Sequence, residues 1–328
     1  MIIVTGGAGF IGSNLVGELN RRGYENILLV DNLENVDKIP NLSGLKINDF
    51  MDKDEFYSRM LDGTEFGNVT SVFHQGACSD TMASDGRYVL HNNFTYSKEV
   101  MAFCGRNGSP FIYASSASVY GAGQVFVESE EYESALNAYA WSKLLFDRYV
   151  RSRGVLDFQV CGLRYFNVYG PGENHKGRMA SVAYHFNNQY RQDGAVRLFA
   201  GSGGYEDGGQ LRDFVFVDDV VDVNMYLLEN PGVSGIFNAG TGRAESFNAV
   251  ALSVINHIRS ESGESAVDLS QAVNSGAIQY IPMPDALVGK YQSYTQADLN
   301  NLRGTGYAGE FHDVASGVGE YLKRMDND

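Results

Sequence analysis

The stretch Ile2-Ile3-Val4-Thr5-Gly6-Gly7-Ala8-Gly9-Phe10-Ile11-Gly12 predicts the fold of this 328-residue chain. Its apolar start has the composition of a short buried strand, and residues 10–20 continue with the apolar spacing of a helix. Glycines at positions 6, 9 and 12 let a pyrophosphate approach the backbone, and the amino end of the helix would stabilise its negative charge. Asp31, about twenty residues further on, ends a second apolar run and can accept a hydrogen bond from a ribose hydroxyl. Together these features predict a dinucleotide site on a Rossmann-type sheet.

The rest of the first half alternates apolar runs with helical patterns, which is typical of a doubly wound parallel sheet in an α/β protein. Further strands are expected at residues 27–30, 69–74, 110–115 and 158–164, and helices near 52–61, 87–106 and 136–153. After about residue 165 this alternation loosens. We therefore expect an NAD(P)-binding Rossmann domain over residues 1–167, with residues 213–240 returning to it. Residues 168–212 and 241–328 would form a smaller, interleaved C-terminal substrate-binding lobe.

The composition excludes several classes of partner. The formal net charge of −15 disfavours nucleic acids and anionic membranes, because both require a basic surface. No apolar run approaches the roughly 18 residues of a membrane span, and no basic leader precedes the first strand. Cys78, Cys104 and Cys161 are widely spaced, without the spacing of metal ligands, which favours reduced buried thiols. The chain is therefore expected to be cytoplasmic and to hold no metal.

A serine, a tyrosine and a lysine supply the candidate catalytic set. Tyr139 and Lys143 are four residues apart in Tyr139-Ala140-Trp141-Ser142-Lys143, so they share one face of an expected helix, and Ser116 ends the strand before it. A phenol ordinarily titrates at about 10, and a neighbouring ammonium together with an oxidised nicotinamide would lower that pKa. The set can therefore take a proton from a substrate hydroxyl while a hydride leaves the same carbon.

The residue types leave the choice between NAD and NADP open. Asp31 favours NAD because its carboxylate repels a 2′-phosphate, whereas an ammonium from Lys38 or Lys53 could hold that phosphate. The small residues within Gln75–Ser79 follow an expected strand and fit a backbone that passes close to a flat cofactor. Asn92, on the next expected helix, could hydrogen-bond this loop or serve the structure alone.

The whole pattern resembles the extended short-chain dehydrogenase/reductase superfamily. Sugar-nucleotide dehydratases of that superfamily carry an Asp-Glu pair after the serine, and this pair protonates a leaving hydroxyl. Here Ser116 is followed by Ala117-Ser118-Val119-Tyr120, which contains no carboxylate. Elimination of water therefore lacks its acid, which leaves epimerases, dehydrogenases and reductases.

Further runs resemble one family within that superfamily, the ADP-L-glycero-D-manno-heptose 6-epimerases, over nearly the whole chain. The runs are Arg164-Tyr165-Phe166-Asn167-Val168-Tyr169-Gly170-Pro171, His175-Lys176-Gly177, Phe199-Ala200-Gly201-Ser202, Arg212-Asp213-Phe214, Gly240-Thr241-Gly242-Arg243-Ala244-Glu245-Ser246-Phe247 and Tyr291-Gln292. The resemblance implies an isomerase that binds NADP and inverts C6 of ADP-D-glycero-D-manno-heptose to the L-glycero form through a transient 6-keto intermediate. It also implies a cytoplasmic homo-oligomer, a pentamer, that supplies a precursor of the lipopolysaccharide inner core.

The resemblance assigns roles position by position. Tyr139 and Lys176 would be the two acid/base residues, and Lys143 and Ser116 would support them. The residues expected to hold the cofactor are Gly6, Gly9, Phe10, Ile11, Gly12, Asp31, Asn32, Lys38, Lys53, Gln75, Gly76, Ala77, Cys78, Ser79, Asn92, Lys143, Val168 and Lys176. The residues expected to hold the substrate are Asn167, Arg178, His185, Phe199, Ala200, Gly201, Ser202, Arg212 and Tyr291.

Some features depart from the family pattern and leave the substrate preference open. Arg178 stands in place of a small hydroxyl residue, Gln75 stands in place of an acidic one, and residues 203–210 and 261–275 are longer than usual. Another nucleotide-sugar epimerase, or a reductase, is the alternative function. A cofactor-binding protein without turnover is disfavoured, because such a protein has no use for a paired phenol and ammonium.

Overall fold

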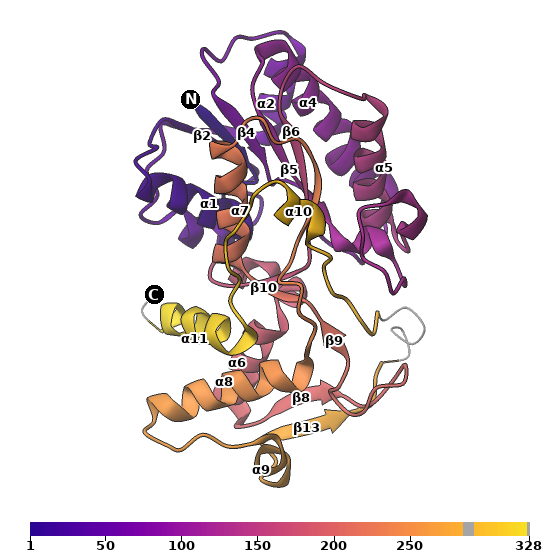
Figure 1. Cartoon of the computed structure of the whole chain (residues 1–328). Helices are drawn as coiled ribbons and strands as arrows, with labels where there is room; N and C mark the ends of the chain where they lie inside the picture. Colours follow the sequence, from indigo (N-terminus) through magenta and orange to yellow (C-terminus); the bar gives the residue numbers. More distant parts are fainter. Residues whose placement is uncertain (285–291, 327–328) are drawn as a thin grey trace.

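The computed structural model describes residues 1–284 and 292–326, which form two lobes (Figure 1). The upper lobe in that view is built on a seven-stranded sheet with helices on both faces. The lower lobe contains helices α6, α8 and α11 together with a short strand pair.

The sheet has the strand order β11-β6-β5-β4-β1-β2-β3, and every neighbouring pair in it is parallel. Its strands are β1 (Ile2–Thr5), β2 (Ile27–Asp31), β3 (Asp49–Asp52), β4 (Ser71–His74), β5 (Phe111–Ser116), β6 (Val160–Tyr165) and β11 (Gly235–Ala239). The chain runs outward from β1 to β3 and then returns to β4 on the other side of β1. This reversal confirms the predicted doubly wound sheet and puts its switch point between β1 and β4.

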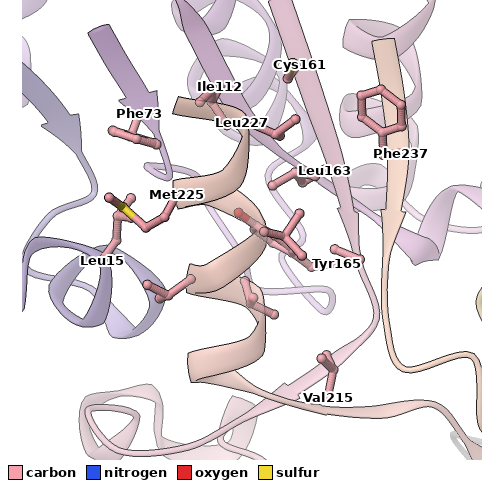
Figure 2. Packing of buried hydrophobic residues seen from close by; sticks show 14 of the residues in the cluster. Leu15, Phe73, Ile112, Cys161, Leu163, Tyr165, Val215, Met225, Leu227 and Phe237 are labelled. Carbon is pink, nitrogen blue, oxygen red and sulfur yellow. The ribbon is translucent and has the colours of Figure 1, made fainter. Parts of the chain in front are cut away.

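Both faces of the sheet are apolar, because successive residues of a strand point to opposite faces and helices cover both. Val4 and Leu29 lie on the face covered by α1 (Phe10–Arg21) and α7 (Val217–Glu229). Figure 2 shows α7 crossing this face, with Met225 among the side chains of its apolar cluster. The amphipathic α1 that follows the glycine-rich loop is therefore held by a dry core.

The opposite face carries the intervening strand residues, such as Ile3 and Leu28. It is covered by α2 (Lys53–Leu61), α4 (Tyr96–Asn107) and α5 (Ala138–Ser152), each of which contributes buried residues to the same apolar cluster. The amino end of α5 therefore comes to lie beside the end of β5, where its polar residues can meet those of the strand.

The helix expected at residues 87–106 is interrupted. It consists of α3 (Gly86–Leu90), a π-helical turn at His91–Thr95, and then α4. A π turn widens a helix locally and is frequent at functional sites. In this turn Asn93 is almost completely buried against the sheet, whereas Asn92 beside it is only partly covered.

The second lobe is assembled from segments that leave the sheet and return to it. Its elements are β7 (Asn167–Tyr169), α6 (Val182–Asp193), β8 (Val196–Phe199), β9 (Leu211–Arg212), β10 (Phe214–Phe216), β12 (Glu245–Ser246), α8 (Phe247–Glu261), α9 (Leu269–Asn274), β13 (Ile278–Ile281) and α11 (Val314–Met325). The short helix α10 (Asn300–Gly304) instead packs against β11 of the main sheet. β8 pairs in parallel with β13, β7 in parallel with β10, and β9 antiparallel with β12. β11 lies in the main sheet beside β6. The predicted domain boundaries remain a prediction.

A buried carboxylate fastens the segments that cross between the lobes. Asp213 has no exposed surface, and its oxygens accept hydrogen bonds from the backbone N–H groups of Thr241 (2.7 Å), Gly242 (2.9 Å) and Ala297 (2.9 Å). Its own backbone carbonyl accepts from Asn167 N–H at 3.0 Å. Three separate stretches of chain are therefore fixed around one residue at the base of the second lobe, two through its side chain and one through its backbone carbonyl.

Candidate functional site

A cleft of about 860 Å³ opens at the carboxyl ends of the parallel strands, under the second lobe. The ends of β1, β2 and β5 reach it through Thr5, Asp31 and Ser116. Open α/β sheets bind ligands at this edge, next to the switch point. The cleft is large enough for two extended ligands, a dinucleotide and a nucleotide sugar.

The glycine-rich loop is shaped so that only glycine fits. A Cβ on Gly6 would lie 2.5 Å from the backbone nitrogen of Gly76, and one on Gly12 would lie 2.1 Å from the carbonyl oxygen of Gly6. Gly6 also has a φ of +68°, which favours glycine. The amino end of α1 has no side-chain cap and no acidic residue in its first turn, so its N–H groups can bind an anion. The loop therefore fits the pyrophosphate of a dinucleotide.

Asp31 joins this loop to a basic group. Its carboxylate is buried, and its two oxygens accept from the backbone N–H of Ala8 and from Nζ of Lys38, both at 2.9 Å. Nζ of Lys38 also donates to the backbone and side-chain oxygens of Asn32 at 3.1 Å. The Asp31 carboxylate is therefore neutralised by an ammonium that belongs to the same site.

Two further predicted cofactor residues contact each other across the cleft wall. Nζ of Lys53, at the start of α2, donates to Oδ1 of Asn92 at 2.9 Å. All eighteen residues assigned to the cofactor by sequence, from Gly6 to Lys176, line the cleft. The geometry thus brings these residues together, although their individual roles stay predictions.

Asn93 was not among the residues predicted from the sequence. Its Oδ1 accepts from the backbone N–H of Cys78 at 2.7 Å, and its Nδ2 donates to the carbonyl of Cys78 at 2.9 Å and to Oγ of Ser142 at 3.0 Å. It therefore holds the loop after β4 against the helix that carries the tyrosine and lysine. Two adjacent asparagines gave no signal as to which one faces inward, because the π turn decides it.

The candidate catalytic groups meet where β5 ends. Ser116 terminates the strand, and Tyr139 and Lys143 lie one turn apart on α5, all three lining the cleft. Nζ of Lys143 donates to the carbonyl of Ala114 at 2.7 Å. Burial lowers the pKa of Lys143 to about 8, against the smaller opposing effect of the nearby Asp147 carboxylate. Burial raises the pKa of Tyr139, and the Ser116 hydroxyl acts in the opposite direction.

A buried ionic network supports this helix from below. Asp147, one turn beyond Lys143, accepts from the Tyr113 hydroxyl (3.0 Å), Oγ of Ser115 (2.9 Å) and Nε of Arg164 (3.0 Å). Arg164 is fully buried and also bonds Glu133. Because these groups satisfy one another's charges, α5 is fixed to β5 and β6 at the level of the catalytic set.

Lys176 enters the cleft from a loop of the second lobe. It lies in a 3₁₀ segment, Asn174–Met179, and its Nζ is 5.0 Å from the centre of the Phe10 ring. Burial lowers its pKa, and the carboxylate of Glu173 opposes this effect. The cleft therefore contains two candidate acid/base groups on different lobes, Tyr139 on α5 and Lys176 on this loop.

The residues expected to hold the substrate divide into two groups. Asn167, Arg178 and Arg212 line the cleft. Arg178 forms an ion pair with Asp80, 3.0 Å away on the loop after β4, so that it spans the two lobes. Arg212 is buried, and its guanidinium lies 5.7 Å from the centre of the Phe247 ring.

The remaining substrate predictions lie elsewhere. His185 is on α6, Phe199 ends β8, and residues 200–202 follow that strand; none of these lines the cleft. The 199–202 segment instead folds against the longer loop beyond it, since Gly201 N–H donates to Asp207 Oδ1 at 2.7 Å and Gln210 Nε2 donates to Ser202 Oγ at 3.1 Å. Tyr291 is outside the described residues. These assignments stay predictions.

Two other features bear on ligands. Over the described ranges, the group with the spacing of metal ligands is His257, Glu261 and Asp326 at the surface, and Arg191 pairs with both of its carboxylates. No helix among the described residues combines the length and apolar character needed to cross a bilayer.

Comparisons with known proteins agree with this geometry. The family model described as NAD dependent epimerase/dehydratase family matches residues 2–240. The ADP-L-glycero-D-manno-heptose-6-epimerase of Thiobacillus denitrificans is 54% identical over 324 residues, which is 98% of either chain.

Solved structures extend the likeness to three dimensions. The ADP-L-glycero-D-manno-heptose-6-epimerase of Helicobacter pylori superposes with a TM-score of 0.81 at 28% identity, covering 100% of this chain and 96% of that one. The UDP-glucose 4-epimerase of Thermus thermophilus in complex with NAD gives a TM-score of 0.74 at 25% identity, covering 99% and 98%. The family model and the glycine-rich cradle together support a nicotinamide cofactor. As the sequence pattern predicted, the chain belongs to the NAD dependent epimerase/dehydratase family and, within it, to the ADP-L-glycero-D-manno-heptose-6-epimerases.

Proposed function

We propose that this enzyme inverts C6 of ADP-D-glycero-D-manno-heptose to the L-glycero form through a transient 6-keto intermediate, with NADP as its cofactor. The observation that carries the proposal is the presence of two candidate acid/base groups, Tyr139 and Lys176, in one cleft with a dinucleotide cradle. The 54% identity to the Thiobacillus denitrificans enzyme supports the choice of substrate. The product would supply a precursor of the lipopolysaccharide inner core.

Tyr139, Ser116 and Lys143 have separate roles in the oxidation of C6. A bound nicotinamide would supply the oxidation of C6 and its later re-reduction. Tyr139 takes the proton of the C6 hydroxyl as that carbon is oxidised, and Ser116 shares the hydrogen bond of the same oxygen. Lys143, whose ammonium is fixed by the Ala114 carbonyl, stabilises the phenolate that Tyr139 must become. This electrostatic help is needed because burial alone raises the pKa of Tyr139.

Inversion requires a second proton donor. The 6-keto group must present its two faces in turn, which rotation about the C5–C6 bond achieves while the ring and the ADP stay bound. Its oxygen then occupies a new position, away from Tyr139. Lys176 can donate a proton there, because burial lowers its pKa and so eases the release of that proton.

Two basic groups at the far end of the cleft support NADP over NAD. Lys38 already neutralises Asp31, which reduces the repulsion that a 2′-phosphate would otherwise meet. Lys53 adds a second ammonium on the neighbouring helix.

We further propose a cytoplasmic homo-oligomer, a pentamer, on the strength of the likeness to the heptose epimerases. Light scattering and cell fractionation would test these two points.

Epimerisation without added reductant is the decisive experiment. The purified enzyme is incubated with ADP-D-glycero-D-manno-heptose in deuterated buffer, and the configuration and deuterium content of C6 are followed by NMR. We expect the L-glycero product with no deuterium at C6, since the same hydrogen is removed and returned. A reductase would form no epimer under these conditions, and deuterium at C6 would indicate an enol and refute the 6-keto route.

Variants of Tyr139 and Lys176 then test whether each acts as an acid/base group. Tyr139→Phe and Lys176→Met should each lower turnover roughly 10²–10⁴-fold with the fold intact. Lys46→Met is a matched control, because this lysine is exposed and pairs with Glu25 at the surface. Near-normal turnover by Lys176→Met would remove the two-base scheme while leaving the epimerase function in place.

A further inference from the structure

The loop that carries Lys176 is closed by one buried carboxylate. This loop runs from Gly170 to Ser181, between β7 and α6, and Glu173 lies within it with no exposed surface. Oε1 of Glu173 accepts from Oγ of Ser181 at 2.7 Å and from the backbone N–H of Gly170 at 3.3 Å. Oε2 accepts from the backbone N–H of Ser181 at 2.5 Å. A single side chain therefore holds the beginning of the loop to its end.

The same residue also fixes the local backbone of Lys176. The N–H of Lys176 donates to the backbone carbonyl of Glu173 at 2.9 Å, which closes the turn that aims the lysine into the cleft. Ser181 is in addition the N-cap of α6, because its Oγ accepts from the backbone N–H of Tyr184. The loop that carries Lys176 is thereby anchored to α6, a long helix of the second lobe.

The carboxylate of Glu173 carries a charge that closing the loop does not by itself require. Its carboxylate forms no ion pair with any Lys or Arg in residues 1–284 and 292–326, and the three hydrogen bonds given above come from uncharged donors. Burying a carboxylate without a partner charge is costly, and a neutral side chain could close a loop at a lower cost. Asp213 is buried in the same way and only fastens the chain, so burial alone gives Glu173 no further role. The ammonium of Lys176, three residues on, gives it one, because it is the cation on which the Glu173 charge acts.

We propose that Glu173 is a positioning residue of the reaction: it closes the Gly170–Ser181 loop so that the ammonium of Lys176 is held in the cleft beside a buried negative charge. This inference rests on the proposed function, in which Lys176 is the second acid/base group. Glu173 acts through Lys176, and does not itself line the cleft.

Two titratable groups adjoin Glu173 and Lys176, one on α11 and one in the loop itself. The phenol of Tyr321 on α11 lies close enough to the Glu173 carboxylate for that charge to act on it, and its pKa is raised mainly by burial. His175 adjoins Lys176, and burial lowers its pKa, with Lys38 and Lys176 adding to the effect. Removal of the Glu173 charge should therefore lower the pKa of Lys176 further, since burial would act without opposition.

Glu173→Gln tests the charge, and Glu173→Ala tests the clamp. We expect each to lower kcat for C6 epimerisation at least tenfold, with the affinity for NADPH, read by its fluorescence, within twofold of wild type. In Glu173→Gln the limb of the kcat–pH profile that belongs to Lys176 should move to lower pH. Turnover within twofold of wild type, or an unmoved limb, would overturn the proposal.

Asp219→Asn is the matched control. Asp219 is another buried carboxylate that holds a backbone N–H, that of His312 at 2.9 Å, and it does not line the cleft. We expect this variant to keep its kcat even where its thermal stability falls as far as that of Glu173→Gln. An equal loss of kcat in both variants would show a general effect of destabilisation and would overturn the proposal.

A readout without substrate separates this inference from the proposed function. Amide hydrogen exchange at Gly170 and Ser181 should accelerate at least tenfold in Glu173→Ala, and acetylation of Lys176 by acetic anhydride should change its pH midpoint in Glu173→Gln. If the wild-type enzyme does not epimerise ADP-heptose, the proposed function fails and these two measurements still decide the role of Glu173. Unchanged exchange and labelling would overturn the clamp, whatever the activity.

Discussion

Replacement of Lys143 by methionine should make the nucleotide-free protein more stable while removing its activity. Lys143 is 5% exposed, and burial lowers its pKa from 10.5 to about 8. At pH 7 the amine is protonated in both the folded and the unfolded chain. The folded state therefore carries a buried charge that its surroundings compensate only in part, and methionine fills a similar volume without one.

The magnitude follows from the two pKa values. Between pH 8 and 10.5 the unfolded chain binds more protons at this site than the folded one, so this group makes stability rise with pH over that window. Below it, the charged lysine costs about 3 kcal/mol relative to a neutral group. Loss of the hydrogen bond to the Ala114 carbonyl returns about 1 kcal/mol. We therefore expect Lys143→Met to be more stable than wild type by about 2 kcal/mol at pH 7.

Urea unfolding of both proteins, with nucleotide removed beforehand, measures this difference, provided that the slopes of the two transitions agree. The gap should narrow by about 2 kcal/mol at pH 9.5, because wild type then folds with a neutral amine. A variant no more stable than wild type at pH 7, or a gap that does not change with pH, would refute the reasoning. Epimerase activity is measured in parallel and should fall strongly in Lys143→Met.

Three further predictions concern the buried His74 of β4 and the charged residues Asp31 and Asp80 of the cleft. Burial lowers the pKa of His74 to about 3, so the unfolded chain gains a proton below about pH 6.5 and the folded chain does not. The free energy of unfolding of wild type should therefore fall by about 2 kcal/mol between pH 7 and pH 5. His74→Gln should not show this loss when both proteins are unfolded in urea at the two pH values. Asp31→Ala should raise the preference for NADP over NAD roughly tenfold in titrations of both nucleotides, because a carboxylate facing the 2′-phosphate is removed while Lys38 stays; an unchanged ratio would count against this role. Asp80→Asn breaks an ion pair with Arg178 that is exposed on both sides, so the free energy of unfolding should change by less than about 1 kcal/mol, and a larger loss would show that the pair holds the lobes together.

The local sequence predicted the sheet and the cofactor loop because their determinants are local. Gly6 and Gly12 are required by backbone atoms within a few residues of one another, or by the adjacent strand. The helix expected near residues 52–61 likewise begins where the sequence indicates, since the side chain of Asp52 caps it by accepting from the backbone N–H of Asp54 at 2.8 Å. Such features depend on short-range sterics and hydrogen bonds, which spacing along the chain expresses directly.

Features set by packing between distant segments could not be predicted in this way. The π turn that buries Asn93 depends on how α4 meets the sheet, and nothing in the run His91-Asn92-Asn93 expresses it. Nothing in the sequence around Glu173 marks it, because its partners Gly170 and Ser181 come within hydrogen-bonding distance only once the loop is folded. The role of Asp213 in fastening the two lobes could not be predicted either, because one of its hydrogen bonds comes from Ala297, far along the chain.

Burial and a nearby carboxylate together set the pKa of Lys143 and of Lys176, although the two lysines lie on different elements. Each is placed in a poorly hydrated site, so that burial lowers its pKa, and each has a carboxylate nearby that limits the effect, Asp147 for Lys143 and Glu173 for Lys176. Burial alone would leave a neutral amine unable to hold a phenolate or to donate a proton, whereas full exposure would leave an ammonium too weakly acidic to release one. A helix supplies the first carboxylate and a closed loop the second, so the balance depends on two independent supports. The chain as a whole is strongly negative, yet these supports place two lysines of lowered pKa where an ADP-linked substrate would react.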